Sequence, residues 1–306
     1  MISGHYPIPA RLNLTLALVL VTALTGLFYL SAFAQGWWLL ALSLSYGLLM
    51  NTGYALLHEA EHGILHPDRR VNEGTGMLLA LFFPAPFHLI RQGHLGHHMR
   101  NRSDDEAFDF YFEGESRLWR FLMLYGILTG LFWVLILCSN LLAAVWPGFL
   151  RPRKFSIDRP SEALLESLNP RFLRLIWLEA VAAILLHGTM IMMWGIPFWH
   201  WLAVLSGFGI MWSAMQYVHH FGTERDVLNG ARNLRTWRWL DALWLYHNWH
   251  QRHHQQPTVP WVHLPALEGG PVQPRAHMIP AWLRMWRGPS LTRQRVANRF
   301  SGRLIR

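Results

Sequence analysis

The stretch Leu12–Leu57 reads LNLTLALVLVTALTGLFYLSAFAQGWWLLALSLSYGLLMNTGYALL, 46 residues without one Asp, Glu, Lys or Arg. A membrane-spanning helix needs about 20 consecutive apolar residues, so this stretch is long enough for two. The turn-forming sequence Ala34-Gln35-Gly36 lies near its middle. We therefore predict two membrane spans, at residues 12–33 and 37–57.

The rest of the chain has the same composition. Hydrophobic residues make up 52% of the 306 residues and charged residues 15%, against about 25% charged in soluble domains. Two more runs, Phe121–Leu150 and Ala180–Thr223, lack charge. This composition excludes a soluble monomer and a disordered chain. Cys138 is the only cysteine, which excludes an internal disulfide, a Cys-ligated iron–sulfur cluster and a zinc ribbon.

Further spans are expected in the second half of the chain. The apolar runs 173–194 and 199–218 are each long enough to cross a bilayer, and Gly195-Ile196-Pro197 separates them. With the first two spans they give an all-α integral membrane protein with four transmembrane helices. We find no internal repeat, and we expect residues 1–306 to form a single membrane domain.

Phe121–Leu150 poses a topological question. As one helix it would be about 45 Å long, more than the apolar core of about 30 Å, and two crossings would have too few residues each. The histidine-rich segments at 58–98 and 219–254 share a membrane side only if this run makes no net crossing. We expect a re-entrant or interfacial helix pair over 121–150, bent near Ser139-Asn140.

Basic residues suggest an orientation. The chain has 27 Lys and Arg against 18 acids. Its last 36 residues hold no acid and eight arginines: Arg275, Arg284, Arg287, Arg293, Arg295, Arg299, Arg303 and Arg306. Nucleic-acid binding is one reading, but retention of positive charge on the cytoplasmic side is the better one. We expect a basic cytosolic tail over 266–306, and a basic loop around Arg151 and Lys154 on the same side.

Histidines form three clusters with helical spacing. They are His58-x-x-x-His62, His94-x-x-His97-His98 and His250-x-x-His253-His254. Residues at i, i+3 and i+4 share one helix face, so each cluster can aim two or three imidazoles at one point. Eight imidazoles exceed the four to six ligands, roughly, that one ion takes, which favours two metal ions. Neutral imidazole suits iron, copper, zinc and nickel. A dinuclear all-nitrogen site at a membrane surface points to oxygen chemistry on a lipid.

Two simpler interpretations compete with this one. A lone histidine is usually structural, and six belong to that group: His5, His66, His187, His200, His263 and His277. His88 and His247 are undecided. His58-Glu59-Ala60-Glu61-His62 also matches H-E-x-x-H, the zinc protease helix in which Glu is the general base. An intramembrane zinc metalloprotease would leave six clustered histidines unexplained.

The three histidine clusters, called histidine boxes below, and their order relative to the apolar runs resemble those of the membrane fatty acid desaturase family. The resemblance covers about residues 15–265, and the residues that flank the boxes agree with it. They are Asn101 and Asp104-Asp105 after the second box, His220-Phe221-Gly222-Thr223 after the last apolar run, and Asn248 with Pro257, Val259-Pro260 and Leu264-Pro265 around the third box.

The resemblance implies a mushroom-like fold with a cytosolic helical cap, and two non-haem iron ions. Nine histidines would hold the irons: His58, His62, His94, His97, His98, His220, His250, His253 and His254. The choice between His219 and His220 as the ninth stays open. Other residues could lie behind the ligands and orient them: Asp104, Asp105, Gln216, His219 and Asn248.

The resemblance also implies an activity. The irons would use O₂ as co-substrate to introduce a double bond into an acyl chain or lipid, with electrons from an external donor such as a ferredoxin. Sibling reactions on this scaffold are acyl or carotenoid hydroxylation, ketolation and decarboxylation to a terminal alkene. A polytopic scaffold without metals is disfavoured because no box position is missing. We expect a multi-pass protein of a bacterial inner membrane with cytoplasmic histidine boxes and no nucleic-acid partner.

Overall fold

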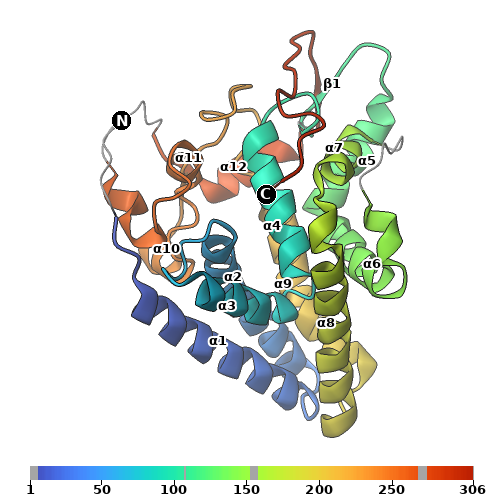
Figure 1. The fold of residues 1–306 in the computed structure, drawn as a ribbon, viewed down its shortest axis with the longest axis vertical. Helices are drawn as coiled ribbons and strands as arrows, with labels where there is room; N and C mark the ends of the chain where they lie inside the picture. The colour runs from blue at the N-terminus through green and yellow to red at the C-terminus, as the bar shows by residue number, and fades with distance from the viewer. Residues whose placement is uncertain (1–5, 107, 152–157, 268–273, 306) are drawn as a thin grey trace.

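A computed structural model describes residues 6–106, 108–151, 158–267 and 274–305 (Figure 1). Helices make up 64% of the structure. Strands in the described ranges are limited to two parallel pairs of two residues each. The all-α prediction therefore agrees with the structure.

Among the described residues, three helices are long and apolar enough to cross a membrane: α1 (Ala10–Ser31), α2 (Trp37–Glu61) and α8 (Leu173–Trp194). The first two coincide closely with the predicted spans at 12–33 and 37–57, and α8 has the predicted bounds. Sequence hydropathy located these helices well because a long run of apolar side chains has few alternatives to a helix in lipid.

The fourth predicted span, 199–218, corresponds to α9 (Phe198–Met215). This 18-residue helix is not among the three apolar enough to cross alone. Its first turn contains Trp199-His200-Trp201, whose polar ring nitrogens lower its mean hydropathy. The helix also ends three residues earlier than predicted. The chain then enters a series of turns that carries His219 and His220.

Small residues let α9 pack closely along α2. A Cβ atom at Gly207 would lie 2.0 Å from the backbone oxygen of Ser43, and one at Gly47 would lie 2.6 Å from the oxygen of Gly207. The Ser43 hydroxyl donates a hydrogen bond to the Ala203 carbonyl at 2.7 Å. Such close backbone contact through glycine is typical of helix pairs in membranes. It fixes α2, which carries the first histidine pair, against α9.

Two helix pairs are sharply bent. The first, α3 (Arg69–Phe82) and α4 (Phe87–Arg100), turns by 101°. The second, α5 (Arg117–Leu128) and α6 (Leu131–Val145), turns by 84°. Each pair is apolar enough to be a broken span or a re-entrant loop, so the structure has from three to five candidate spans.

The position of the second bend differs from the prediction. The chain bends at Gly130, which has a φ of +91°, a left-handed conformation open to glycine. Ser139 and Asn140, where we expected the bend, lie inside α6. Asn140 is buried there, so its polar side chain marks a packed helix face instead of a break.

The remaining elements are short; α11, α12 and β1 lie above the long helices in Figure 1, and we call this end of the molecule the cap. The short elements are β1 (Phe110–Tyr111), η1 (Pro147–Leu150), α7 (Arg159–Ser167), η2 (Pro170–Phe172), β2 (Leu234–Arg235), α10 (Arg238–Leu243), α11 (His250–Gln255), η3 (Trp261–Ala266), β3 (Ala276–His277), α12 (Met278–Met285) and β4 (Ser290–Leu291). Pairing of β1 with β4 and of β2 with β3 attaches the C-terminal segment to the cap. Of the predicted basic loop at 151–159, residues 152–157 lie outside the described residues, while Arg151 is described and Arg159 begins α7.

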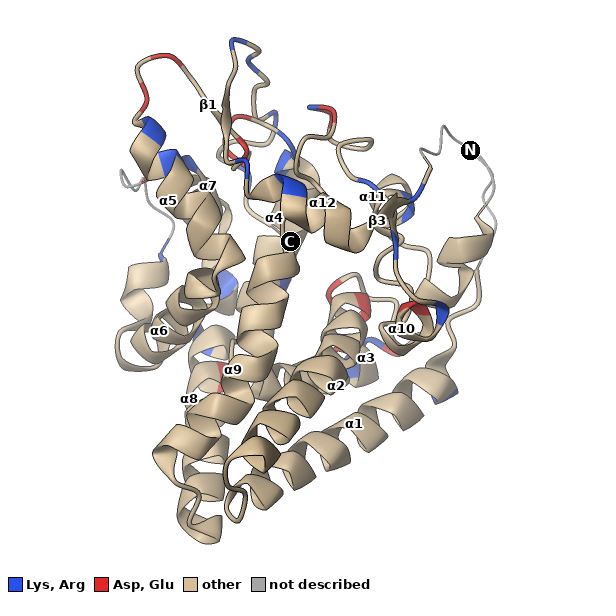
Figure 2. Ribbon diagram, turned by 180° about the vertical axis from the view of Figure 1, so that it is seen from behind, with Lys and Arg blue, Asp and Glu red and all other residues tan. Residues whose placement is uncertain are grey.

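Charge is distributed unevenly between the two ends of the molecule. Figure 2 shows most Lys, Arg, Asp and Glu residues around the cap, while the ribbons of α1, α2 and α8 are almost free of them below it. The last turn of α2, the turns after α9 and the short helix α11 all lie at this polar end. The fold therefore gathers histidine-bearing segments that are up to 196 residues apart in sequence.

Candidate metal centre

Nine histidine side chains converge between α2, α4, α11 and the turns after α9. They form two groups, and within each group the nearest ring nitrogens all lie within 4.8 Å of one another. The first cluster is His58, His62, His94, His98 and His253. The second cluster is His97, His220, His250 and His254. All nine histidines named in the sequence analysis are included, whereas His219 is in neither cluster.

The two helices with H-x-x-H-H spacing, α4 and α11, divide their histidines between the two clusters in opposite ways. On α4, the i and i+4 residues His94 and His98 enter the first cluster and the i+3 residue His97 enters the second. On α11, the i and i+4 residues enter the second cluster and His253, at i+3, enters the first. Since i+3 and i+4 are neighbours on a helix face, each helix serves both clusters at once.

Ring contacts within the first cluster run through Nε2 atoms. His94 Nε2 lies 2.8 Å from His62 Nε2 and 3.1 Å from His98 Nε2. His98 Nε2 in turn lies 2.9 Å from His253 Nε2. The His58 ring packs against His94 and His253, with centroids 4.4 and 4.2 Å away. Its Nε2 atom is buried and has no hydrogen-bond partner in the described chain.

The second cluster has the same construction. His250 Nε2 lies 3.1 Å from His220 Nε2 and 3.2 Å from His254 Nε2. His97 Nε2 lies 3.3 Å from His254 Nε2. Four histidines from three separate segments therefore turn the same ring atom toward one point.

These distances fit metal coordination. Two nitrogens bound to one ion at about 2.1 Å are about 3.0 Å apart at a right angle and about 3.4 Å apart at the tetrahedral angle. The Nε2 separations given above are 2.8 to 3.3 Å, and the remaining ring-nitrogen separations within each group are at most 4.8 Å. Imidazole nitrogens also gain little from facing one another, since in each pair only one can donate a proton. A cation at each point would satisfy several nitrogens at once.

Burial keeps the cap histidines in the form that binds metals. It lowers the pKa of His250, His254 and His220 well below the usual range of histidine, and neighbouring imidazoles act in the same direction. The neutral imidazole is therefore the stable form at neutral pH, and it is the form that donates a lone pair to a metal.

Groups behind the rings hold several of them through Nδ1. The Nδ1 atom of His220 lies 2.8 Å from the Gly230 carbonyl, and that of His97 lies 3.0 Å from Glu106 Oε1. The Glu61 carboxylate is 3.9 Å from His94 Nδ1. The contacts of His220 and His97 favour the tautomer with its proton on Nδ1 and leave Nε2 free for a metal.

The residues expected to orient ligands are placed differently by the structure. Asp104 forms ion pairs with Arg225 and Arg295, and Asp105 accepts a hydrogen bond from Asn298. Both carboxylates face the C-terminal segment. The neighbouring Glu106 makes the histidine contact. The chain leaves the helix after Arg100, so helical periodicity no longer predicts which of these three acids turns inward.

Asn248 and Gln216 also have no hydrogen bond to a cluster histidine within the described ranges. Asn248 donates to the Leu234 carbonyl at 2.8 Å and to Asp241 at 2.7 Å, which ties α11 to β2 and α10. His219 stays close to the site. Its ring centroid is 4.6 Å from that of His250, and its Nδ1 lies 3.3 Å from the Arg232 carbonyl.

A buried ion pair that the sequence did not reveal holds the segment after His220. Arg102 is fully buried and bonds Asp109 at 2.7 and 3.1 Å. Asp109 also accepts from the Tyr217 hydroxyl at 2.7 Å and from the Gly222 N–H at 2.6 Å. The pair thus connects the end of α4 to the turn that carries His220.

A small cavity reaches the first cluster. Its lining combines His58, His253 and His247 with Glu59, Ala55, Leu245, Trp261 and Leu264. Leu245 and Tyr246 have φ values of +49° and +53°, although neither is a glycine. Two consecutive left-handed residues are costly, and such conformations are concentrated at functional sites. This turn holds Leu245 and His247 against the cluster.

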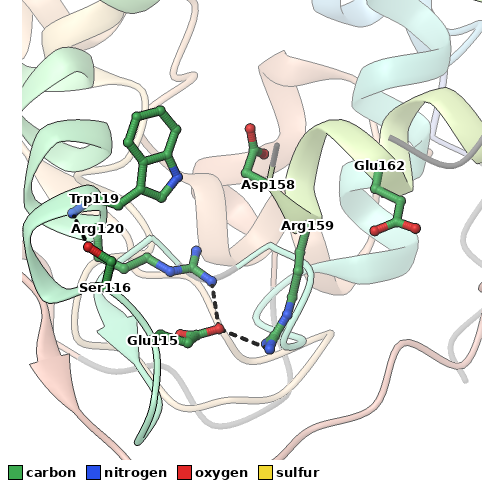
Figure 3. A pocket seen from close by; sticks show the side chains of 7 residues that line it. All are labelled: Glu115, Ser116, Trp119, Arg120, Asp158, Arg159 and Glu162. Atoms are coloured by element: carbon green, nitrogen blue, oxygen red, sulfur yellow. Dashed lines mark hydrogen bonds and ion pairs between the residues drawn. The ribbon is translucent and has the colours of Figure 1, made fainter. Parts of the chain in front are cut away.

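A second, more open pocket lies between α5 and α7 (Figure 3). It is lined by Glu115, Ser116, Trp119, Arg120, Asp158, Arg159 and Glu162. Figure 3 shows the Arg120 and Arg159 side chains both reaching the Glu115 carboxylate, at 3.3 and 2.9 Å. No lining residue is a histidine, so this pocket is separate from the candidate metal centre.

Helices able to cross a membrane, together with nine buried histidines in two adjacent groups, define a helical membrane protein with a histidine-only site that could hold metal ions. Residues 35–283 match the family model for fatty acid desaturase. The chain belongs to the fatty acid desaturase family, which makes it an oxidoreductase of the desaturase or hydroxylase type. No match was found among curated proteins.

Proposed function

We propose that this protein is a di-iron, O₂-dependent desaturase that introduces a double bond into an acyl chain. One observation carries the proposal: nine imidazoles form two adjacent groups with separations that suit two metal ions. Imidazole ligation alone would also suit copper, zinc or nickel. Family membership favours iron.

The first cluster would hold one iron with five histidines, and the second cluster would hold the other with four. When bound, the iron pair supplies the oxidising power, with O₂, to remove hydrogen from an unactivated C–H bond. The chain's own part is to fix the imidazoles, exclude water and place the substrate carbon. His220 is our choice for the ninth ligand because its Nε2 faces His250 Nε2.

The cavity beside the first cluster marks where an acyl substrate would reach it, but its volume of about 10 Å³ has room for one water molecule, so its walls would have to move apart to admit an acyl chain. Its wall includes Ala55, Leu245 and Leu264, which are apolar, and it ends at His58 and His253. An acyl chain lying there would bring a methylene group to the histidine cluster while buried side chains keep water away. The strained turn at Leu245 and Tyr246 would hold the chain at a fixed depth.

Electrons would come from an external donor, and we propose that the arginine-rich C-terminal segment receives it. Arg287, Arg293 and Arg299 are exposed there. The segment pairs with the chain at the end of α4, since Asp104 N–H donates to the Val296 carbonyl at 2.8 Å. Two residues further along, Glu106 contacts His97. An acidic carrier such as a ferredoxin would be attracted to this surface.

The membrane arrangement follows from where the segments meet. The end of α2 and the turns after α9 contribute to one site, so they lie on one side of the bilayer. We propose that this side is the cytoplasm of a bacterial cell, that α9 completes four spans, and that α5 and α6 form a re-entrant or interfacial pair. A reporter fused near Asp158 that read as periplasmic would contradict this arrangement.

The alternatives are weighed by particular contacts. A sibling reaction, such as hydroxylation or decarboxylation to a terminal alkene, would use the same histidines and differ only in substrate placement. The zinc protease alternative needs Glu59 beside the metal. The Glu59 carboxylate instead accepts a hydrogen bond from the Trp261 N–H at 3.1 Å. Family membership also favours an oxidoreductase.

Metal analysis of the purified protein tests the proposal together with lipid profiling. We expect about two irons per chain, and new unsaturated acyl chains in a host that expresses the protein. A host expressing His254→Ala should not produce them. One zinc per chain would favour the protease, and absence of bound metal would favour a scaffold.

A further inference from the structure

Two glutamates outside the histidine set each face one of two neighbouring histidines on α4. We propose that Glu61 and Glu106 are positioning residues, one for each metal ion, which hold His94 and His97 through their Nδ1 atoms. The inference rests on the proposed metal centre and goes beyond it, because it assigns to each cluster its own carboxylate.

The contact between Glu106 and His97 is direct. Glu106 Oε1 lies 3.0 Å from His97 Nδ1, while His97 Nε2 points into the second cluster, 3.3 Å from His254 Nε2. The second carboxylate oxygen of Glu106 accepts from Arg100 at 3.2 Å. Arg100 is itself buried and held by Ser167. The carboxylate is thus fixed from behind and presents one oxygen to the imidazole.

Glu61 occupies the matching place at the first cluster. It is the last residue of α2, its side chain is completely buried, and in the described chain neither carboxylate oxygen has a hydrogen-bond partner. A buried carboxylate without a partner is costly. Its Oε2 is 3.9 Å from His94 Nδ1, about 1 Å beyond a hydrogen bond. Arg91, the other nearby charge, is already engaged by Glu73 at 3.2 Å.

His94 has a central place in its cluster, so the contact of Glu61 with its Nδ1 would affect the whole first cluster. Its Nε2 faces the Nε2 atoms of both His62 and His98. A cation bound at Nε2 makes the Nδ1–H a stronger donor, and the Glu61 carboxylate is the acceptor within reach. Closing the remaining distance would fix the ring plane and increase the electron density on Nε2.

Within the described ranges, His94 and His97 are the cluster histidines whose Nδ1 atoms face a carboxylate. His220, by comparison, faces a neutral carbonyl, that of Gly230. The helix α4 supplies ligands to both clusters. One carboxylate behind a histidine of each cluster would therefore influence the binding and the oxidation state of both ions through this one helix. The added negative charge should strengthen metal binding and favour the more oxidised state of each ion.

The experiment compares Glu61→Gln and Glu106→Gln with the unchanged protein. Gln keeps the size of the side chain but removes its charge. Glu179→Gln is the matched control, because Glu179 forms a buried pair with His88 outside both clusters. Iron(II) affinity is measured without oxygen by competition with a coloured chelator. Mössbauer spectra of the ⁵⁷Fe-loaded proteins report on the two ions separately.

Each Gln variant should weaken the binding of one ion by about 10–100-fold and change one Mössbauer component, a different one in each variant. Glu61→Asp and Glu106→Asp, which keep the charge, should restore part of the affinity. They also serve if a Gln variant does not fold. Glu179→Gln should change neither component.

Unchanged affinity and spectra in both Gln variants would overturn the inference, as would an equal loss in Glu179→Gln. Those results would leave the proposed function standing, provided that the unchanged protein binds two irons. If the unchanged protein binds no iron, the proposed function fails first and this inference fails with it.

Discussion

The rings of His98 and His254 stack with centroids 4.2 Å apart and planes inclined by 25°, although they belong to different clusters. This contact places the two groups side by side. Moving a histidine ring in one cluster should therefore also shift a ring in the other. It also joins α4 to α11, two helices that carry the same H-x-x-H-H spacing.

Replacement of His254 by Ala should therefore affect more than one ligand position. We expect the iron content to fall to about one per chain or less and desaturation to fall by more than about 100-fold, since losing only a supporting contact costs 10–100-fold. His97→Ala should behave alike. Metal analysis and lipid profiles measure both effects, and membrane insertion is checked by fractionation. Full activity in either variant would contradict the assignment.

Glu59→Gln should be well tolerated. The amide oxygen of Gln can still accept the hydrogen bond from the Trp261 N–H, so we expect a loss of unfolding free energy on the order of 1 kcal/mol and nearly unchanged turnover. Activity and iron content of the purified variant provide the check. In a zinc protease this substitution would remove the general base, so complete inactivation would revive that alternative.

Because α2 and α9 pack closely, replacing a glycine at their contact should lower stability far more than replacing a glycine elsewhere. Gly207→Ala would place a Cβ 2.0 Å from the Ser43 oxygen, and we expect a cost of about 1–3 kcal/mol. Gly188, on α8, has nothing within 4 Å of a built Cβ. Gly188→Ala should therefore be neutral or slightly stabilising. Thermal unfolding in detergent compares the two, and equal effects would show that the helices separate readily.

Loss of the buried Arg102–Asp109 pair should destabilise the cap. Arg102→Leu leaves a buried carboxylate uncompensated, at a cost of about 3–5 kcal/mol. Because Asp109 also binds the Gly222 N–H, we expect iron to be lost as the segment after His220 loosens. Chemical unfolding and metal analysis test this. The double variant with Asp109→Asn should recover part of the stability, and no recovery would mean that the pair itself matters little.

Reversing exposed charges in the C-terminal segment should slow reduction by a protein donor. With Arg287, Arg293 and Arg299 all changed to Glu, we expect at least a tenfold lower reduction rate with a plant-type ferredoxin at low salt. The rate with dithionite should not change. Arg70→Glu, an exposed change on α3, is the control. Stopped-flow absorbance measures the rates, and equal slowing with both reductants would point to a structural effect.

Sequence spacing singled out histidines that the structure brings together, but it did not indicate which groups surround them. His94, His97 and His98 are held on one face by helix geometry, which the chain sets locally. Nothing local distinguishes Glu106 from Asp104 and Asp105, because all three follow the end of α4. Glu61 was visible only as part of a possible protease motif. The sequence does not indicate the bend at Gly130, because the run 121–150 is uncharged and apolar throughout, so hydropathy alone marks no break in it.

The sequence by itself determined the apolar helices and the spacing within each histidine box, since both depend on residues that are neighbours in the chain. Only the tertiary structure decided how the boxes divide into two clusters, that His220 and not His219 belongs to the second cluster, and which carboxylates lie behind the rings. Those relationships join residues far apart in sequence. They follow from how closely α2 and α9 pack and from the contacts between histidine rings of α4 and α11, which no local pattern specifies.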